Sequence, residues 1–193
     1  MKKWFTSKHI FNGVFVAVLL AILLIPPAKA IVIRGLIEIG LFNPSPARNL
    51  TDIGHDLSAI RFKDIKGKEV SLADLKGKVI FLNFWATWCP PCLAEMPSIQ
   101  RIYREEASEQ FVFLLVDADS DLKKAQQYMD RKKFSLPVYE ASGAVPEVLF
   151  NGSLPTTVIL DKKGRIAYKG VGAANYASPK FRTFIKNLLA ARD

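Results

Sequence analysis

The two cysteines of this chain, Cys89 and Cys92, stand where an apolar run gives way to a helical pattern. The run at 79–85 is typical of a buried strand, and a helix is expected from about Cys89 to Glu106. A thiol at a helix N-terminus faces unpaired N–H groups and the positive end of the helix dipole, which favour its thiolate and lower its pKa. The i, i+3 spacing places both sulfurs on one face, within disulfide reach. We therefore expect a redox pair, with Cys89 pointing outward and Cys92 covered by the helix.

A metal site and a static structural disulfide are the two alternative uses of such a cysteine pair. Zinc takes four ligands, and only His9 and His55 are left among the softer ligand types to complete a set. A static disulfide across so short a loop would restrict the unfolded chain little. The intervening Pro90 and Pro91 suit a first helical turn, where no N–H is needed. The sequence thus favours a redox pair and predicts neither a metal nor a cofactor.

The segment from Phe84 to Cys92, with Glu95 and Pro97 after it, resembles the TlpA/ResA-like branch of the thioredoxin superfamily. The resemblance covers about the last two thirds of the chain. It implies an α/β thioredoxin fold, a central mixed sheet flanked by helices, with an N-terminal β-hairpin. It also implies an extracytoplasmic thiol-disulfide oxidoreductase that reduces client proteins, as in cytochrome c maturation, and that is recharged by a membrane electron-donor protein.

Client contacts follow from the same resemblance. Pro155 is implied to be the cis-proline that faces the redox pair, and an ordinary turn proline is the alternative. The backbone of Leu154 would pair with an extended client peptide. Trp88 abuts the first cysteine and would shield it or contact a client. Together with Pro90 and Pro91, these residues form the expected substrate-binding set.

A proton acceptor for the second cysteine is harder to assign. Many thioredoxins bury an acid on the strand before the motif, and the matching position here is Asn83, whose amide cannot take a proton. Glu95 matches an acidic position of ResA-like proteins and lies one turn past Cys92, so it is the candidate substitute. An exposed helix glutamate is the alternative interpretation.

The N-terminus is predicted to direct the chain to a membrane. Residues 1–9 are basic without an acid, and residues 10–25 are apolar apart from a central Asn-Gly pair. The basic residues should stay in the cytoplasm and send the rest across. Ala28 to Ala30 has the form of a cleavage site, and sixteen residues span about 24 Å, short of a ~30 Å hydrocarbon core. These facts favour a cleaved signal peptide and a soluble periplasmic domain. The resemblance to a largely tethered family favours a single-pass anchor in the inner membrane instead.

The chain is accordingly divided into a signal anchor or signal peptide at 1–30, an interfacial helix and linker at 31–54, and a thioredoxin-like domain at 55–193. Arg34 and Glu38 stand at i, i+4 in the interfacial segment. Periodicity and turn residues predict the remaining elements. They are a hairpin at 59–71, a strand at 111–116, a helix at 121–133, a short strand at 136–139, a helix at 144–150 in an insertion spanning 140–153, a hairpin at 156–168 and a last helix from Ser178.

The charge balance does not indicate a nucleic-acid partner. The formal net charge is +9, of which +5 lies beyond residue 42. The basic clusters at 131–133 and 162–165 have no interleaved aromatic residues, so they are interpreted as solvated surface. Two functional rivals stay open: a disulfide oxidant or isomerase, and a client-binding or assembly module with little turnover.

Overall fold

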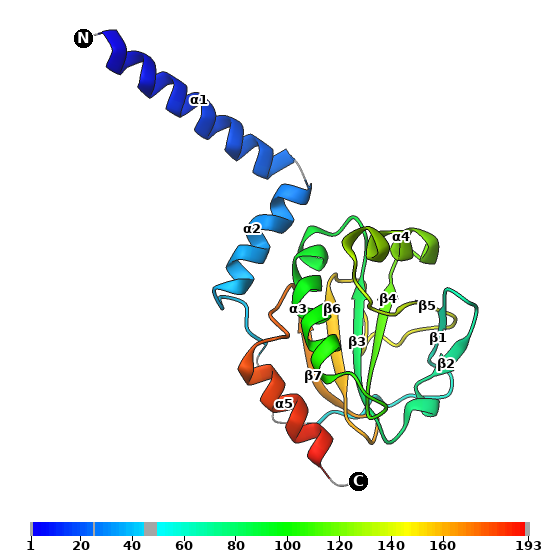
Figure 1. Ribbon diagram of the computed structural model, residues 1–193. Coiled ribbons are helices and arrows are strands. Elements are labelled where there is room, and N and C mark those ends of the chain that lie inside the picture. Colours follow the sequence, from blue (N-terminus) through cyan, green and yellow to red (C-terminus); the bar gives the residue numbers. More distant parts are fainter. Residues whose placement is uncertain (1, 25, 45–49, 192–193) are drawn as a thin grey trace.

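Figure 1 shows the computed structural model of the chain, which describes residues 2–24, 26–44 and 50–191. The strands are β1 (Arg61–Asp64), β2 (Glu69–Ser71), β3 (Val79–Trp85), β4 (Phe111–Asp117), β5 (Val138–Ala141), β6 (Thr156–Leu160) and β7 (Ile166–Val171). They form one seven-stranded mixed sheet in the order β2-β1-β5-β4-β3-β6-β7. β3 lies at its centre, parallel to β4 and antiparallel to β6. This arrangement is the thioredoxin fold that the sequence predicts.

Helices cover one face of the sheet, and irregular segments cover the other. The helices are α1 (Lys2–Leu24), α2 (Pro26–Glu38), the short 3₁₀ helix η1 (Ala73–Leu75), α3 (Pro90–Glu106), α4 (Leu122–Lys132) and α5 (Pro179–Ala190). α3, α4 and α5 pack with the Phe81 and Phe113 side of the sheet in one core cluster. The Leu82 and Leu114 side packs against η1, the entering chain and the segment after β5. Every residue of β3 is therefore buried, as expected for a strand covered on both faces.

The N-terminal hairpin is confirmed. β1 and β2 pair antiparallel, and β1 also pairs antiparallel with β5, so the hairpin extends the sheet at one edge. The side chain of Asp64 accepts hydrogen bonds from the N–H groups of Lys66 and Lys68, which closes the turn.

The prediction of a helix at 144–150 is wrong. This segment forms a turn, in which the N–H groups of Leu149 and Phe150 both donate to the carbonyl oxygen of Pro146. Pro146 disfavours the helical backbone conformation at Val145, the residue before it, so a helix is not expected to run through this point. Packing fixes the segment instead: Leu149 is buried, and the rings of Phe150 and Phe84 stack with centroids 4.4 Å apart.

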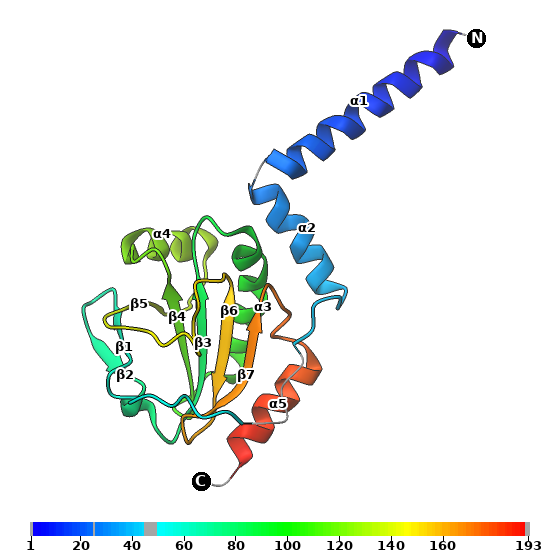
Figure 2. The ribbon, with the colours of Figure 1, turned by 180° about the vertical axis from the view of Figure 1, so that it is seen from behind.

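The N-terminal region forms two helices. α1 extends away from the domain, whereas α2 runs beside α3 (Figures 1 and 2). α2 begins at Pro26, earlier than the interfacial helix expected from residue 31, because proline is tolerated in a first helical turn. The ion pair between Arg34 Nε and Glu38 Oε1 is present at 3.0 Å.

Residues 45–49 of the interfacial helix and linker expected at 31–54 lie outside the described residues. In the part of the chain that the structure does describe, no helix combines the length and apolarity needed to cross a bilayer. Residues 10–24 of the apolar stretch lie within α1.

Candidate functional site

Cys89 and Cys92 form a disulfide at the N-terminus of α3. The S–S distance is 2.04 Å and the two Cα atoms are 5.3 Å apart. Cys89 is the N-cap residue, and its sulfur accepts a hydrogen bond of 3.3 Å from the N–H of Cys92. The strand-to-helix position is thus as predicted. The outward orientation expected for Cys89 is not: it is 3 % exposed and Cys92 is 0 % exposed, so both are buried in the oxidised state.

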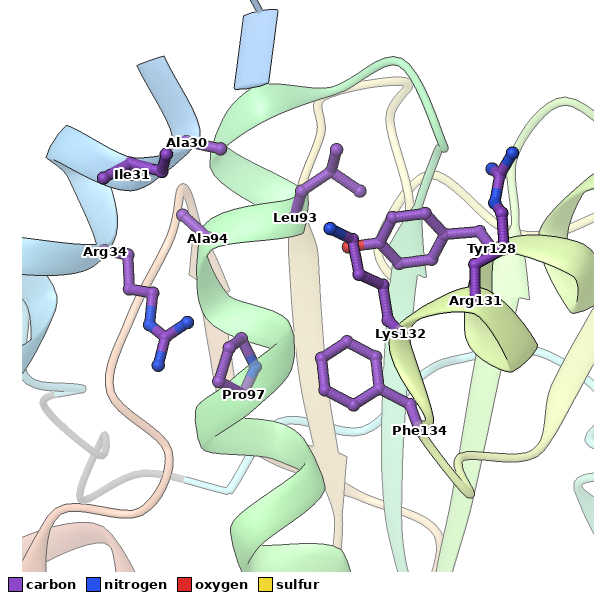
Figure 3. Close-up of a pocket in the computed structure, with 10 residues that line it drawn as sticks. All are labelled: Ala30, Ile31, Arg34, Leu93, Ala94, Pro97, Tyr128, Arg131, Lys132 and Phe134. Atoms are coloured by element: carbon purple, nitrogen blue, oxygen red, sulfur yellow. The ribbon is translucent and has the colours of Figure 1, made fainter. Parts of the chain in front are cut away.

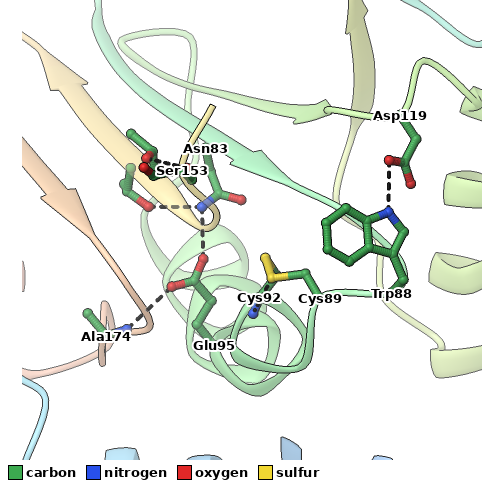
Figure 4. The surroundings of a disulfide bond; sticks show 10 residues. Asn83, Trp88, Cys89, Cys92, Glu95, Asp119, Ser153 and Ala174 are labelled. Atoms are coloured by element: carbon green, nitrogen blue, oxygen red, sulfur yellow. Dashed lines mark hydrogen bonds between the residues drawn. A yellow bond between two sulfur atoms is a disulfide. The ribbon is translucent and has the colours of Figure 1, made fainter. Parts of the chain in front are cut away.

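Glu95 lies one turn further along α3 and is fully buried (Figure 4). Its interpretation as an exposed helix glutamate is therefore wrong. Asn83 Nδ2 donates to Glu95 Oε1 at 2.8 Å, and the N–H of Ala174 donates to Oε2 at 3.3 Å. Burial raises the pKa of Glu95 to about 8, although both hydrogen bonds act to lower it. A carboxyl group of this kind exchanges its proton near neutral pH.

Asn83 connects the carboxyl group to the neighbouring strand. It lies on β3 opposite Thr157 of β6, and its Nδ2 also donates to Thr157 Oγ1 at 2.8 Å. Among the described residues, Asn83 Oδ1 is buried without a hydrogen-bond partner. An amide can present either its NH₂ group or its oxygen. By turning over, the Asn83 side chain could therefore serve Glu95 in both protonation states.

The loop after β7 completes the surroundings of Glu95 and reaches α2. Ala174 supplies the backbone N–H that contacts the carboxylate, and the N–H of Tyr176 donates to the hydroxyl of Ser98 on α3. Between them, the N–H of Asn175 donates to the carbonyl oxygen of Phe42 at 2.8 Å. The segment that follows α2 is thereby joined to the loop that contacts the buried carboxylate.

Pro155 ends the loop that leads into β6, beside the end of β3. The Leu154–Pro155 peptide bond is cis, as the resemblance implies. The next residue, Thr156, pairs with Phe84 on β3, which places Pro155 level with the strand end that leads into the redox motif. Leu154 is partly buried against both core clusters. A client segment lying along Leu154 would thus be adjacent to the disulfide.

Trp88 is the exposed aromatic residue of the motif. Its exposed fraction is 59 %, and its indole N–H donates to Asp119 Oδ1 at 2.8 Å (Figure 4). Trp85, three residues earlier, is fully buried in the core. The bond to Asp119 restrains the Trp88 ring and leaves its apolar face accessible beside the disulfide. Pro90 and Pro91 lie between the cysteines and are partly exposed.

The structure brings together Cys89, Cys92, Glu95 and Asn83, as the sequence suggests. It adds Thr157, Ala174, Asn175 and Asp119. These residues lie outside the cysteine motif in the sequence and reach the site only in the folded chain, so no local sequence pattern marks them. Among the described residues, no cluster of histidine, cysteine, aspartate and glutamate side chains could hold a metal ion.

The fold and this site define a thioredoxin-like oxidoreductase with a dithiol/disulfide centre. Comparison with known proteins identifies the family. The Redoxin family model matches residues 52–184, and the chain belongs to that family.

Individual relatives agree with this assignment. The chain is 33 % identical to the thiol-disulfide oxidoreductase ResA of Bacillus cereus over 121 residues, covering 62 % of this chain and 70 % of the relative. It is 34 % identical to the thioredoxin-like protein YneN of Bacillus subtilis over 121 residues, covering 62 % and 71 %. Among solved structures, a thiol:disulfide interchange protein of Chlorobium tepidum matches with a TM-score of 0.54 and 29 % identity, covering 77 % of this chain and 97 % of that one.

Proposed function

We propose that the chain reduces disulfide bonds of client proteins on the extracytoplasmic side of a membrane, with Cys89 as the nucleophile and Cys92 as the resolving thiol. One observation carries the proposal: the cysteine pair at the start of α3 has the carboxyl group of Glu95 buried one turn away. The relatives named thiol-disulfide oxidoreductases support the reaction class.

The reaction begins with the reduced protein. The Cys89 thiolate attacks one sulfur of a client disulfide, which forms a mixed disulfide and releases the first client thiolate. Cys92 then gives its proton to Glu95, and the new Cys92 thiolate attacks the sulfur of Cys89. This step releases the second client thiolate and forms the Cys89–Cys92 disulfide that the structure contains. The client gains two electrons, and the protein loses two.

Glu95 is suited to this proton transfer in both directions. In the oxidised protein its pKa of about 8 keeps the carboxyl group largely protonated at neutral pH, which is the state left after Cys92 has given up its proton. When an electron-donor protein attacks the disulfide, the same group returns the proton to Cys92 as that sulfur leaves. A membrane electron-donor protein is the proposed source of these electrons, and cytochrome c maturation is the proposed setting.

Client binding is proposed for the surface on both sides of the disulfide. Trp88 offers an exposed aromatic face, held by Asp119. Leu154 precedes the cis peptide bond and offers backbone groups to an extended segment. Pro90 and Pro91 lie between these two contacts. An unfolded or extended client would fit such a surface better than a folded one, because strand-like pairing needs an accessible peptide backbone.

The membrane tether is part of the proposal. It is supported by the basic residues 1–9, the apolar residues 10–25 and the resemblance to a largely tethered family. N-terminal sequencing of the protein isolated from cells tests it. A chain that retains residues 1–30 and sediments with membranes agrees with a tether in the inner membrane. A chain that starts at Ile31 contradicts it and indicates a cleaved signal peptide.

Activity and reduction potential test the redox role. We expect the reduced protein to cleave insulin disulfides and a Cys89→Ser variant to have no activity. We also expect a reduction potential below about −200 mV against a glutathione or dithiothreitol series, as in reducing thioredoxins. A potential near −120 mV would indicate an oxidant instead. If the wild-type protein reduces no disulfides and binds clients with the same affinity as Cys89→Ser, the chain is a binding module instead.

A further inference from the structure

A cavity of about 430 Å³ lies where α2, α3 and α4 meet (Figure 3). Its size falls within the range of small-molecule sites, about 300 to 1,000 Å³. The redox mechanism uses none of its lining residues. Most of the wall is apolar or aromatic and comes from all three helices and the segment that follows α4: Ala30, Ile31, Leu93, Ala94, Pro97, Tyr128 and Phe134.

Three basic side chains complete the lining: Arg34, Arg131 and Lys132. Figure 3 shows the guanidinium group of Arg34 and the ammonium group of Lys132 on the cavity side. Arg34 is paired with Glu38. Within the described residues, Arg131 and Lys132 make no ion pair. Both residues lie in the last turn of α4, where a positive charge interacts favourably with the negative end of the helix dipole. This interaction does not account for the apolar cavity beside them.

The cavity adjoins an apolar surface that the domain leaves uncovered. Ile31, which lines the cavity, is 71 % exposed, and Leu24 at the end of α1 is 74 % exposed. α1 leaves the molecule from the N-terminal end of α2, the end that contributes Ala30 and Ile31 to the cavity (Figure 1). A ligand in this position would therefore meet a positive edge, an apolar pocket and an apolar helix together.

We propose that this cavity binds one anionic phospholipid, with part of an acyl chain against the apolar wall and the phosphate on Arg131 and Lys132. The inference rests on the membrane tether proposed above, and it does not depend on the thiol chemistry. An acidic peptide would match the charge as well, but the apolar wall offers few partners for its backbone N–H and carbonyl groups. A lipid has no such groups along its chain, and α1 would hold the domain where lipids are abundant.

Native mass spectrometry of the full chain, released from detergent with added lipid, tests the proposal. We expect one dioleoylphosphatidylglycerol to be retained, and dioleoylphosphatidylcholine to be retained at least tenfold less. Each basic residue near an anionic lipid surface contributes about fivefold in affinity, so Arg131→Glu with Lys132→Glu should weaken retention more than tenfold. The matched control is Lys76→Glu with Lys163→Glu, because these exposed lysines lie at the end of the sheet opposite the cysteines.

A second variant tests the apolar wall without changing charge. Ala30→Phe would fill the cavity from α2, so phosphatidylglycerol retention should fall while insulin reduction and the helical circular dichroism signal stay unchanged. Equal retention of the two lipids, or retention that neither variant lowers, would overturn the proposal. Capture of an acidic peptide at the cavity without phosphatidylglycerol retention would also overturn it and assign the site to a protein partner.

Discussion

Replacing Glu95 by glutamine removes the ionisable group that the structure buries beside the disulfide. Burial raises the pKa of Glu95 from its ordinary value of 4.5 to about 8. A rise of this size corresponds to at most about 5 kcal/mol of free energy between the folded and unfolded states. Because the folded-state pKa is the higher one, this contribution to stability is fully present below about pH 4.5. It is lost as the pH rises through about 8.

Denaturant unfolding of the oxidised full chain, measured from about pH 5 to about pH 9, tests this magnitude. We expect the wild type to lose several kcal/mol of unfolding free energy over this range relative to Glu95→Gln, whose amide does not titrate. Glu109→Gln is the control, since Glu109 is exposed just beyond α3, and it should follow the wild type. Parallel curves for wild type and Glu95→Gln would refute the argument that burial holds this carboxyl group in its protonated form.

Three further experiments, one labelling measurement and two substitutions, probe the same site. In the reduced protein, iodoacetamide should label Cys89 faster than Cys92 at neutral pH, and equal rates would remove the assignment of the nucleophile. Asn83→Asp places a second carboxyl group within hydrogen-bond distance of Glu95 and raises its pKa, so the lower limb of the pH–rate profile for disulfide reduction, where Glu95 must be a carboxylate to accept the proton, should move to higher pH; an unchanged profile would contradict the contact. Asn175→Ala removes the side-chain bond to the amide two residues on, so hydrogen exchange in this loop should speed up with little change in global stability. Unaltered exchange would show that the side chain does not hold the loop.

Much of the fold could be predicted because its signals are local. The apolar run of β3 predicts a buried strand, and Ser178 with Pro179 marks the start of α5, as the structure confirms. The helix expected at 144–150 failed because a proline and tertiary packing outweighed a short apolar pattern. Short segments carry little helical preference of their own, so their contacts decide the conformation.

The site was predictable only in part. Spacing placed the two cysteines and Glu95 on one helix, but the burial of Glu95 depends on residues far along the chain. Ala174 is separated from it by 79 residues in sequence, and the bond between Asn175 and Phe42 joins the last loop to the N-terminal region. Such contacts leave no periodic pattern in a single sequence. They become visible only when the fold brings the segments together.

Trapping the mixed disulfide tests the central claim most directly. Reduced Cys92→Ser and Cys89→Ser variants would each be mixed with a model disulfide substrate, quenched with acid and analysed by mass spectrometry. Because the first step needs only the Cys89 thiolate, Cys92→Ser should accumulate a covalent adduct at Cys89, and Cys89→Ser should accumulate none. An adduct that forms at Cys92, or equal adducts in both variants, would contradict the account.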